Sequence, residues 1–253
     1  MDKQVDFTSS PDDDDWRLQT TARVSEPWLN PWTLETVMPG TRITVVSVIK
    51  LNSKKQITIP IPNATALLLN AAARAFSEAR AIRSRNNIDG TLIREVSMAS
   101  DQDAFDYLER MIESIVLAFT ALEAFINEYI PADFTHTRQG RDGLPETLDK
   151  TAIERFMSID EKLSAVLPAV LSCASLKGSR IWNDYVQLRK VRDRVVHMKF
   201  ADRRSSGTEV DTIWRAIFLT SAPHLTVKVV IDHFIKAMDS KPGWHAKYPF
   251  GKR

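Results

Sequence analysis

Residues 189–200 read RKVRDRVVHMKF, and Arg192 and His197 within them have side chains suited to chemistry on an anion. A histidine exchanges protons near neutral pH, and an arginine holds a phosphate through several N–H donors. At about 100° per residue, Arg192 falls into the apolar stripe of its helix. That stripe contains Ile181, Tyr185, Leu188, Val195 and Val196. Because a buried guanidinium without acceptors is unfavourable, Arg192 needs a partner or a hydrated cleft.

A long helix expected over residues 101–130 supplies polar groups for that partnership. Its apolar face consists of Phe105, Leu108, Ile112, Val116, Phe119, Ile126 and Ile130. Glu123 lies on this face, and Asn127 lies at its edge one turn later. We expect the two helices to pack together, with Glu123 or Asn127 accepting a hydrogen bond from Arg192. A buried ion pair that only fixes helix register is an equally good interpretation.

His197 lies about 140° around its helix from Arg192. Asp193 precedes it by four residues and is placed to orient the imidazole ring. One helix therefore points the arginine and the histidine in different directions. The length of the arginine side chain, or a cleft shared by two copies of the chain, would bring them together. For a monomer, an exposed histidine without a role is the simpler interpretation.

Basic residues surround this histidine. The seven between positions 189 and 204 are Arg189, Lys190, Arg192, Arg194, Lys199, Arg203 and Arg204. Only Asp193 and Asp202 oppose them. A local excess of positive charge suits a polyanion such as RNA, although a solvated helix face is the alternative.

The fold expected from these patterns is all-α: an antiparallel helical bundle with a small N-terminal β-hairpin extension. Glycine is scarce, with 8 residues, and the hydrophobic fraction is 43%, which allows a sizeable core. Helices are expected over residues 63–84, 101–130, 151–167, 179–202, 211–220 and 224–239.

Four segments are expected along the chain. Residues 1–20 include PDDDD and predict a disordered acidic tail. Residues 21–62 form an N-terminal extension, in which TRITVVSVIK and KQITIPIP predict a β-hairpin. A helical domain occupies residues 63–240, and residues 241–253 form a basic C-terminal tail.

Several classes of protein are disfavoured by the composition. The net charge of +2 does not by itself point to nucleic acid. The single cysteine excludes a disulfide framework and disfavours a cysteine-based zinc site. No histidine spacing resembles a metal motif, and no glycine-rich phosphate loop is present, so we expect neither metal nor cofactor. No signal peptide or membrane span is evident, which predicts a cytoplasmic protein without a membrane partner.

RDRVVH, from Arg192 to His197, resembles the R-x4-6-H signature of the HEPN superfamily, where a polar residue such as Asp193 often follows the arginine. ALEAFINEYI, residues 121–130, is similar to the preceding long helix of many HEPN proteins. An acidic or polar residue there faces the arginine–histidine pair, and Glu123 occupies that position with Asn127 beside it. The resemblance covers about residues 100–240 and implies a HEPN-like bundle.

The resemblance implies a metal-independent endoribonuclease of toxin or anti-phage defence, acting as a homodimer on RNA. Two copies of His197 would serve as acid and base, and Arg192 would hold the phosphate. Asp193 and Glu123, with Asn127 beside them, would position this pair. The RNA strand would lie along Arg189, Lys190, Arg194, Lys199, Arg203 and Arg204.

One position departs from part of the family. HEPN toxins silenced by nucleotide transfer have a tyrosine two residues after the histidine, and Lys199 stands there in this chain. If the protein is a toxin, we therefore expect control by an antitoxin or regulatory protein partner, by oligomerisation or by activation on infection. The alternative function is a non-catalytic HEPN module that binds RNA or a protein partner. A structural subunit that uses Val191, Val195 and Val196 is a third possibility.

Overall fold

In a computed structural model of the chain, the described residues are 15–19, 21–30, 33–140, 143–204 and 206–250. They divide into two compact units, one of residues up to 67 together with 242 onwards, and one of residues 68–241. Most of the expected acidic tail, residues 1–14 and 20, lies outside the described residues. In the described part of the chain, no helix has both the length and the apolar character of a membrane span.

The prediction of an all-α chain is wrong. About 51% of the chain is helical and 12% is strand, so the fold is mixed. Within the described residues the strands form four separate antiparallel pairs, β1–β4, β2–β3, β5–β6 and β7–β8. The strands of the first three pairs belong to the first unit: β1 (Thr21–Arg23), β2 (Trp28–Leu29), β3 (Thr36–Val37), β4 (Arg42–Thr44), β5 (Val46–Lys50) and β6 (Gln56–Pro60). The hairpin expected in this region is confirmed as β5–β6, with Ile49 opposite Ile57.

The first unit also contains residues 242–250, which belong to the segment expected to be a basic C-terminal tail. A short helix, α9 (Gly243–Ala246), buries Trp244. The ring of Trp16 meets that of Tyr248 edge-on, with centroids 5.5 Å apart. Residues 242–250 are therefore packed structure, because their aromatic side chains have apolar surface to bury.

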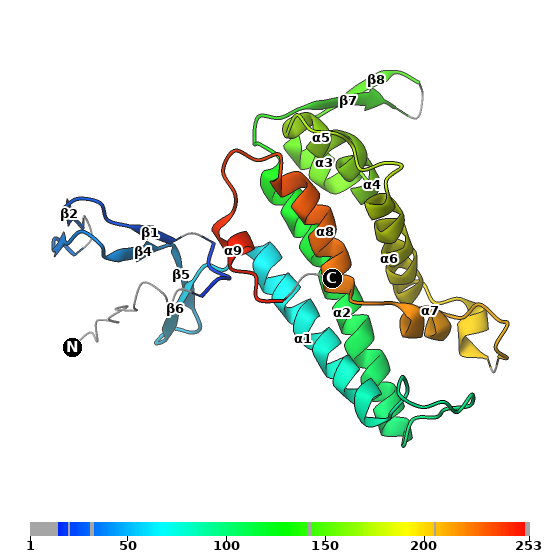
Figure 1. The fold of residues 1–253 in the computed structure, drawn as a ribbon. Coiled ribbons are helices and arrows are strands. Elements are labelled where there is room, and N and C mark those ends of the chain that lie inside the picture. Colours follow the sequence, from blue (N-terminus) through cyan, green and yellow to red (C-terminus); the bar gives the residue numbers. More distant parts are fainter. Residues whose placement is uncertain (1–14, 20, 31–32, 141–142, 205, 251–253) are drawn as a thin grey trace. The chain divides into compact units, whose positions relative to one another are not determined.

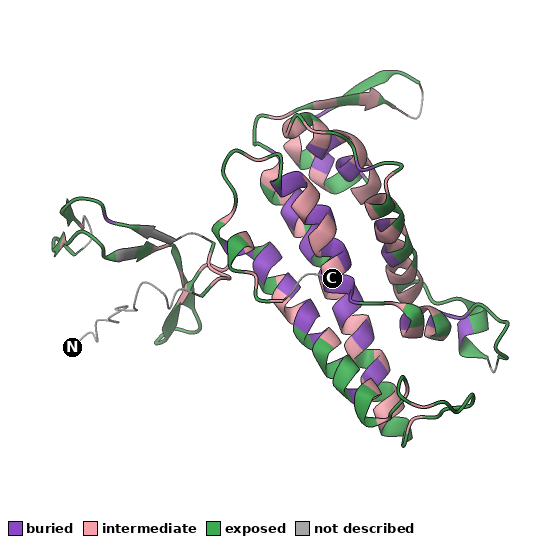
Figure 2. Ribbon diagram, viewed as in Figure 1, coloured by how far each residue is buried: buried purple, intermediate pink, exposed green. Residues whose placement is uncertain are grey.

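The second unit is built on long helices that lie side by side (Figure 1). Its elements are α1 (Ala64–Arg85, beginning in the first unit), α2 (Asp101–Tyr129), β7 (His136–Gln139), β8 (Pro145–Leu148), α3 (Lys150–Phe156), α4 (Ile159–Glu161), η1 (Lys162–Val166), α5 (Leu167–Val170), α6 (Arg180–Val196), η2 (Phe200–Arg203), α7 (Ile213–Leu219) and α8 (Pro223–Ile235). Helix α2 packs against α6 and α8, and α6 also packs against α7 and α8. Buried residues recur along α2 and α8, whereas β7 and β8 are mostly exposed (Figure 2).

Local signals explain where the long helices begin. The side chain of Asn63 accepts from Ala66 N–H at 3.0 Å at the start of α1. Ser100 accepts from Asp103 N–H at 3.1 Å at the start of α2. Each cap satisfies a backbone donor that the first turn of a helix leaves without a partner. The expected starts of these two helices are confirmed within one or two residues.

Two predicted elements differ in the structure. The helix expected over 151–167 is interrupted, because Ser158 and Glu161 form a capping box that starts a new helix. The helix expected over 179–202 stops at Val196. A third element, the β7–β8 hairpin, lies between the helices expected over 101–130 and 151–167, where no strand was predicted. It is held by a 3.0 Å hydroxyl contact between Thr137 and Thr147.

Candidate functional site

The arginine–histidine motif lies at the C-terminal end of α6. Ser179 caps the start of this helix by accepting from Trp182 N–H at 3.1 Å. His197 is the first residue beyond the helix, and its backbone N–H donates to Asp193 O at 2.9 Å. Its imidazole is exposed, with no hydrogen-bond partner among the described residues. His197 is therefore accessible to a ligand or a second protein.

Arg192 is held by an aromatic ring and not by a carboxylate of α2. Its guanidinium carbon lies 4.0 Å from the centre of the Phe119 ring. Its one ion pair among the described residues joins Nη1 to Asp193 Oδ1 at 3.1 Å. The side chain keeps 29% exposure, while Nε is buried and has no partner in the described structure. The arginine thus retains donor capacity and accessible surface for an anion.

The expected hydrogen bond from Arg192 to Glu123 or Asn127 is not formed. Asn127 Oδ1 instead accepts from Lys162 Nζ at 3.1 Å, and Lys162 also donates to the carbonyl of Glu154 at 3.0 Å. Glu123 is exposed. Burial lowers the pKa of Lys162, against the attraction of Glu123 and Glu154. Both α2 residues therefore belong to the surroundings of a buried lysine, which the sequence did not single out.

Asp193 has a different role from the one expected. Its carboxylate pairs with Arg192, and only its backbone carbonyl contacts His197. The predicted orientation of the imidazole by the Asp193 side chain is therefore not seen. Instead Asp193 links the two motif residues, since it contacts the side chain of one and the backbone of the other.

Arg189 lies one turn before Arg192 and is paired with Asp160 of α4. The hydroxyl of Tyr185 donates to the other oxygen of Asp160 at 2.5 Å. Burial, together with Asp160, raises the pKa of Tyr185. Asp160 therefore neutralises Arg189, which was expected to face RNA. Asp160 fell inside the helix expected over 151–167 and was not singled out from the sequence.

Arg194 is also neutralised. Its guanidinium contacts Asp202 at 2.8 Å and Asp211 at 2.7 Å. The Asp202 side chain has 0% exposure and also accepts from the backbone N–H groups of Lys199, at 2.8 Å, and Ile213, at 2.7 Å. The hydrogen bond to Arg194 lowers the pKa of Asp202 to about 2. This network ends the helix at Val196, and it removes Arg194 from the set of RNA-binding candidates.

The remaining basic candidates are accessible. Lys190, Lys199 and Arg203 are exposed, and in the described part of the chain none has an ion pair. Arg204 is exposed, and its guanidinium carbon lies 3.9 Å from the centre of the Phe200 ring. The positive surface is thus narrower than expected, and it lies mainly beyond the end of α6.

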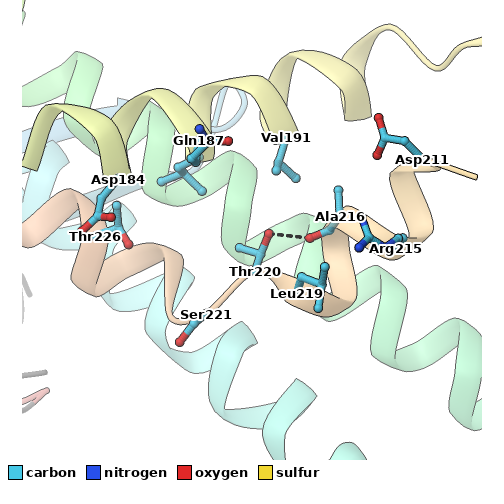
Figure 3. A pocket seen from close by; sticks show the side chains of 11 residues that line it. Asp184, Gln187, Val191, Asp211, Arg215, Ala216, Leu219, Thr220, Ser221 and Thr226 are labelled. Atoms are coloured by element: carbon cyan, nitrogen blue, oxygen red, sulfur yellow. Dashed lines mark hydrogen bonds between the residues drawn. The ribbon is translucent and has the colours of Figure 1, made fainter. Parts of the chain in front are cut away.

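A cavity of about 390 Å³ lies between α6, α7 and α8 (Figure 3). Its lining residues are Asp184, Gln187, Leu188, Val191, Asp211, Arg215, Ala216, Leu219, Thr220, Ser221 and Thr226. Neither Arg192 nor His197 belongs to this lining. The motif, at the C-terminal end of α6, therefore does not line this cavity.

No three histidine, cysteine, aspartate or glutamate residues of the described chain form a group able to hold a metal ion. No protein-family model, no curated protein and no solved structure matches this chain. The likeness to HEPN proteins therefore depends on the residues of the motif and of α2 alone.

Proposed function

We propose that the chain is a metal-independent endoribonuclease of HEPN type whose site is completed by a second copy. The observation that carries the proposal is the state of Arg192. Its guanidinium is partly exposed over Phe119, has no carboxylate of α2 as partner, and lies on the same helix end as the accessible His197. An arginine held by a ring keeps its N–H donors for a phosphate.

The chemistry asks for a base, an acid and a cation. One imidazole removes the proton from a ribose 2′-OH, and the oxygen attacks the adjacent phosphorus. The bond from phosphorus to the 5′-oxygen breaks, and a protonated imidazole gives its proton to that oxygen. The products are a 2′,3′-cyclic phosphate and a 5′-hydroxyl. Arg192 stabilises the charge of the phosphorane, and Asp193 holds Arg192.

A second copy supplies the second imidazole, because His197 is the one histidine of the motif at the end of α6. Apolar side chains near the motif support such a contact. Val196 is 56% exposed and Met198 is 37% exposed, and they flank His197 in the sequence. Covering these side chains would remove apolar surface from water and place the two His197 side chains at one interface.

A non-catalytic module that binds RNA is the second candidate function. It is favoured by one observation: the carboxylates of Asp193 and Glu123 do not hold the His197 ring. In that case Arg192 and the exposed basic residues bind the RNA strand without cleaving it. The two functions share a surface and differ in whether the histidine transfers protons.

Cleavage in EDTA separates them. The wild type is expected to cut single-stranded RNA and leave 2′,3′-cyclic phosphate ends, whereas His197→Ala and Arg192→Ala lose this activity by at least about a hundredfold. His233→Ala is the matched control, since its ring contacts the carbonyl of Ala174, remote in sequence from the motif. Equal cleavage by all variants, or no cleavage by a wild type that binds RNA, would exclude the proposed chemistry.

A further inference from the structure

Phe200 is an exposed aromatic residue three positions after His197. It begins η2, and 68% of its surface is accessible. The Arg204 guanidinium lies 3.9 Å from the ring centre and covers one side of it. A single exposed phenyl ring is ordinary on a protein surface, so a ligand is indicated only by the groups that surround Phe200.

The ring stands on a rigid base. Residue 202, at the centre of η2, is a fully buried aspartate that accepts from Lys199 N–H, Ile213 N–H and Arg194. Trp214 Nε1 also donates to the Asp202 carbonyl at 2.8 Å. These bonds fix the turn that carries Phe200, so a ligand would meet a surface already in place.

The surroundings of the ring are cationic. Lys199 precedes it, and Arg203 and Arg204 follow, all exposed. Asp202 is the acidic residue within the turn, and its charge is met by Arg194. A ligand that suits both an accessible ring and several cations is aromatic and anionic, which describes a nucleotide.

We infer that Phe200 and Arg204 form a base-stacking subsite, which takes an unpaired base next to the phosphate held by Arg192. The subsite rests on the proposed function and names its substrate class: single-stranded RNA with an unstacked base. Bases within a duplex are stacked on their neighbours and cannot cover the ring. In the proposed dimer the second copy covers Val196 and Met198, and the ring of Phe200 is assigned to the RNA.

Binding to an RNA that cannot be cut tests the subsite separately from cleavage. The probe is a fluorescein-labelled single-stranded 2′-O-methyl RNA ten nucleotides long, followed by anisotropy. Phe200→Ala is expected to weaken binding by roughly tenfold, while Phe200→Trp retains it. Phe156→Ala is the matched control, because this phenylalanine is 66% exposed and also lies beside an arginine, with Arg155 at 5.6 Å.

A series of probes with one abasic position each locates the stacked base. Removal of the base at one position should weaken binding to the wild type. The same probe should bind Phe200→Ala no more weakly than the intact RNA does. Equal binding by Phe200→Ala and wild type, or no binding by either, overturns the subsite. Loss of dimerisation by Phe200→Ala, measured by light scattering, would assign the ring to a protein interface and also overturn it.

The two proposals fail in different ways. Binding that depends on Phe200, without any cleavage, would support the base-stacking subsite and contradict the proposed ribonuclease activity. Cleavage that depends on His197, together with binding that does not depend on Phe200, would support the ribonuclease activity and contradict the subsite.

Discussion

The guanidinium carbon of Arg192 on α6 lies 4.0 Å from the centre of the Phe119 ring on α2. This contact joins the two helices at the position where the sequence led us to expect a hydrogen bond to Glu123 or Asn127. The ring also stacks with Tyr185, at a centroid distance of 6.0 Å. Phe119 therefore supports both a cation and an aromatic side chain of α6.

A double-mutant cycle measures this contact. Phe119→Leu and Arg192→Met should each reduce the free energy of unfolding, and together they should cost less than the sum. The coupling expected for a partly exposed cation over a ring is about 0.5–1 kcal/mol. Urea unfolding of the four proteins provides the values. Strictly additive changes in the free energy of unfolding would show that the contact between the arginine and the ring does not stabilise the protein.

Asp202 should be essential for the stability of the turn that follows the end of α6. Asp202→Asn should reduce the free energy of unfolding by roughly 3 kcal/mol, because Arg194 would lose its buried partner. Asp211→Asn is the control. Asp211 is 76% exposed and contacts the same arginine, so its loss should cost less than about 1 kcal/mol. Similar losses in urea unfolding of the two variants would contradict the burial argument.

His224 should make stability depend on pH between about 6.5 and 4. It is buried against Phe76, and burial lowers its pKa to about 4. An unfolded histidine binds its proton near pH 6.5, so acid favours the unfolded chain within this window. The contribution of His224 is complete above the unfolded pKa and falls as the pH decreases through 4, by about 3 kcal/mol in all.

The free energy of unfolding, measured in urea at several pH values, tests this pH dependence. His224→Leu should flatten this dependence between pH 6.5 and 4. A slope that persists in His224→Leu would assign the effect to another group.

Sequence reasoning succeeded where local signals act alone. The starts of α1 and α2 follow from Asn63 and Ser100, whose side chains cap the first turn. The β5–β6 hairpin follows from two runs of β-branched residues. The hairpin near Thr137 has no such alternation, and its strands are held by polar contacts between side chains. It therefore left no hydrophobic pattern to detect.

The site was only partly predictable for a related reason. Helical periodicity placed Arg192 in an apolar stripe, and the structure confirms that its side chain is largely covered. Periodicity does not say which residue of α2 faces it, because a shift of one turn exchanges Glu123 for Phe119. Long-range partners such as Asp160 for Arg189 depend on the path of the chain between helices, which spacing does not encode.

The proposed shared site makes a prediction about association. Val196→Asp places a carboxylate in the exposed apolar surface beside His197, where burial against a second copy would be costly. We expect this variant to be monomeric and to lose cleavage, while circular dichroism shows an intact fold. Phe105→Asp is the matched control, because Phe105 is 61% exposed on α2 and remote in sequence from the motif. It should leave association and cleavage unchanged. A monomeric Val196→Asp that still cleaves RNA would show that one chain holds the whole site, and a second imidazole would then be unnecessary.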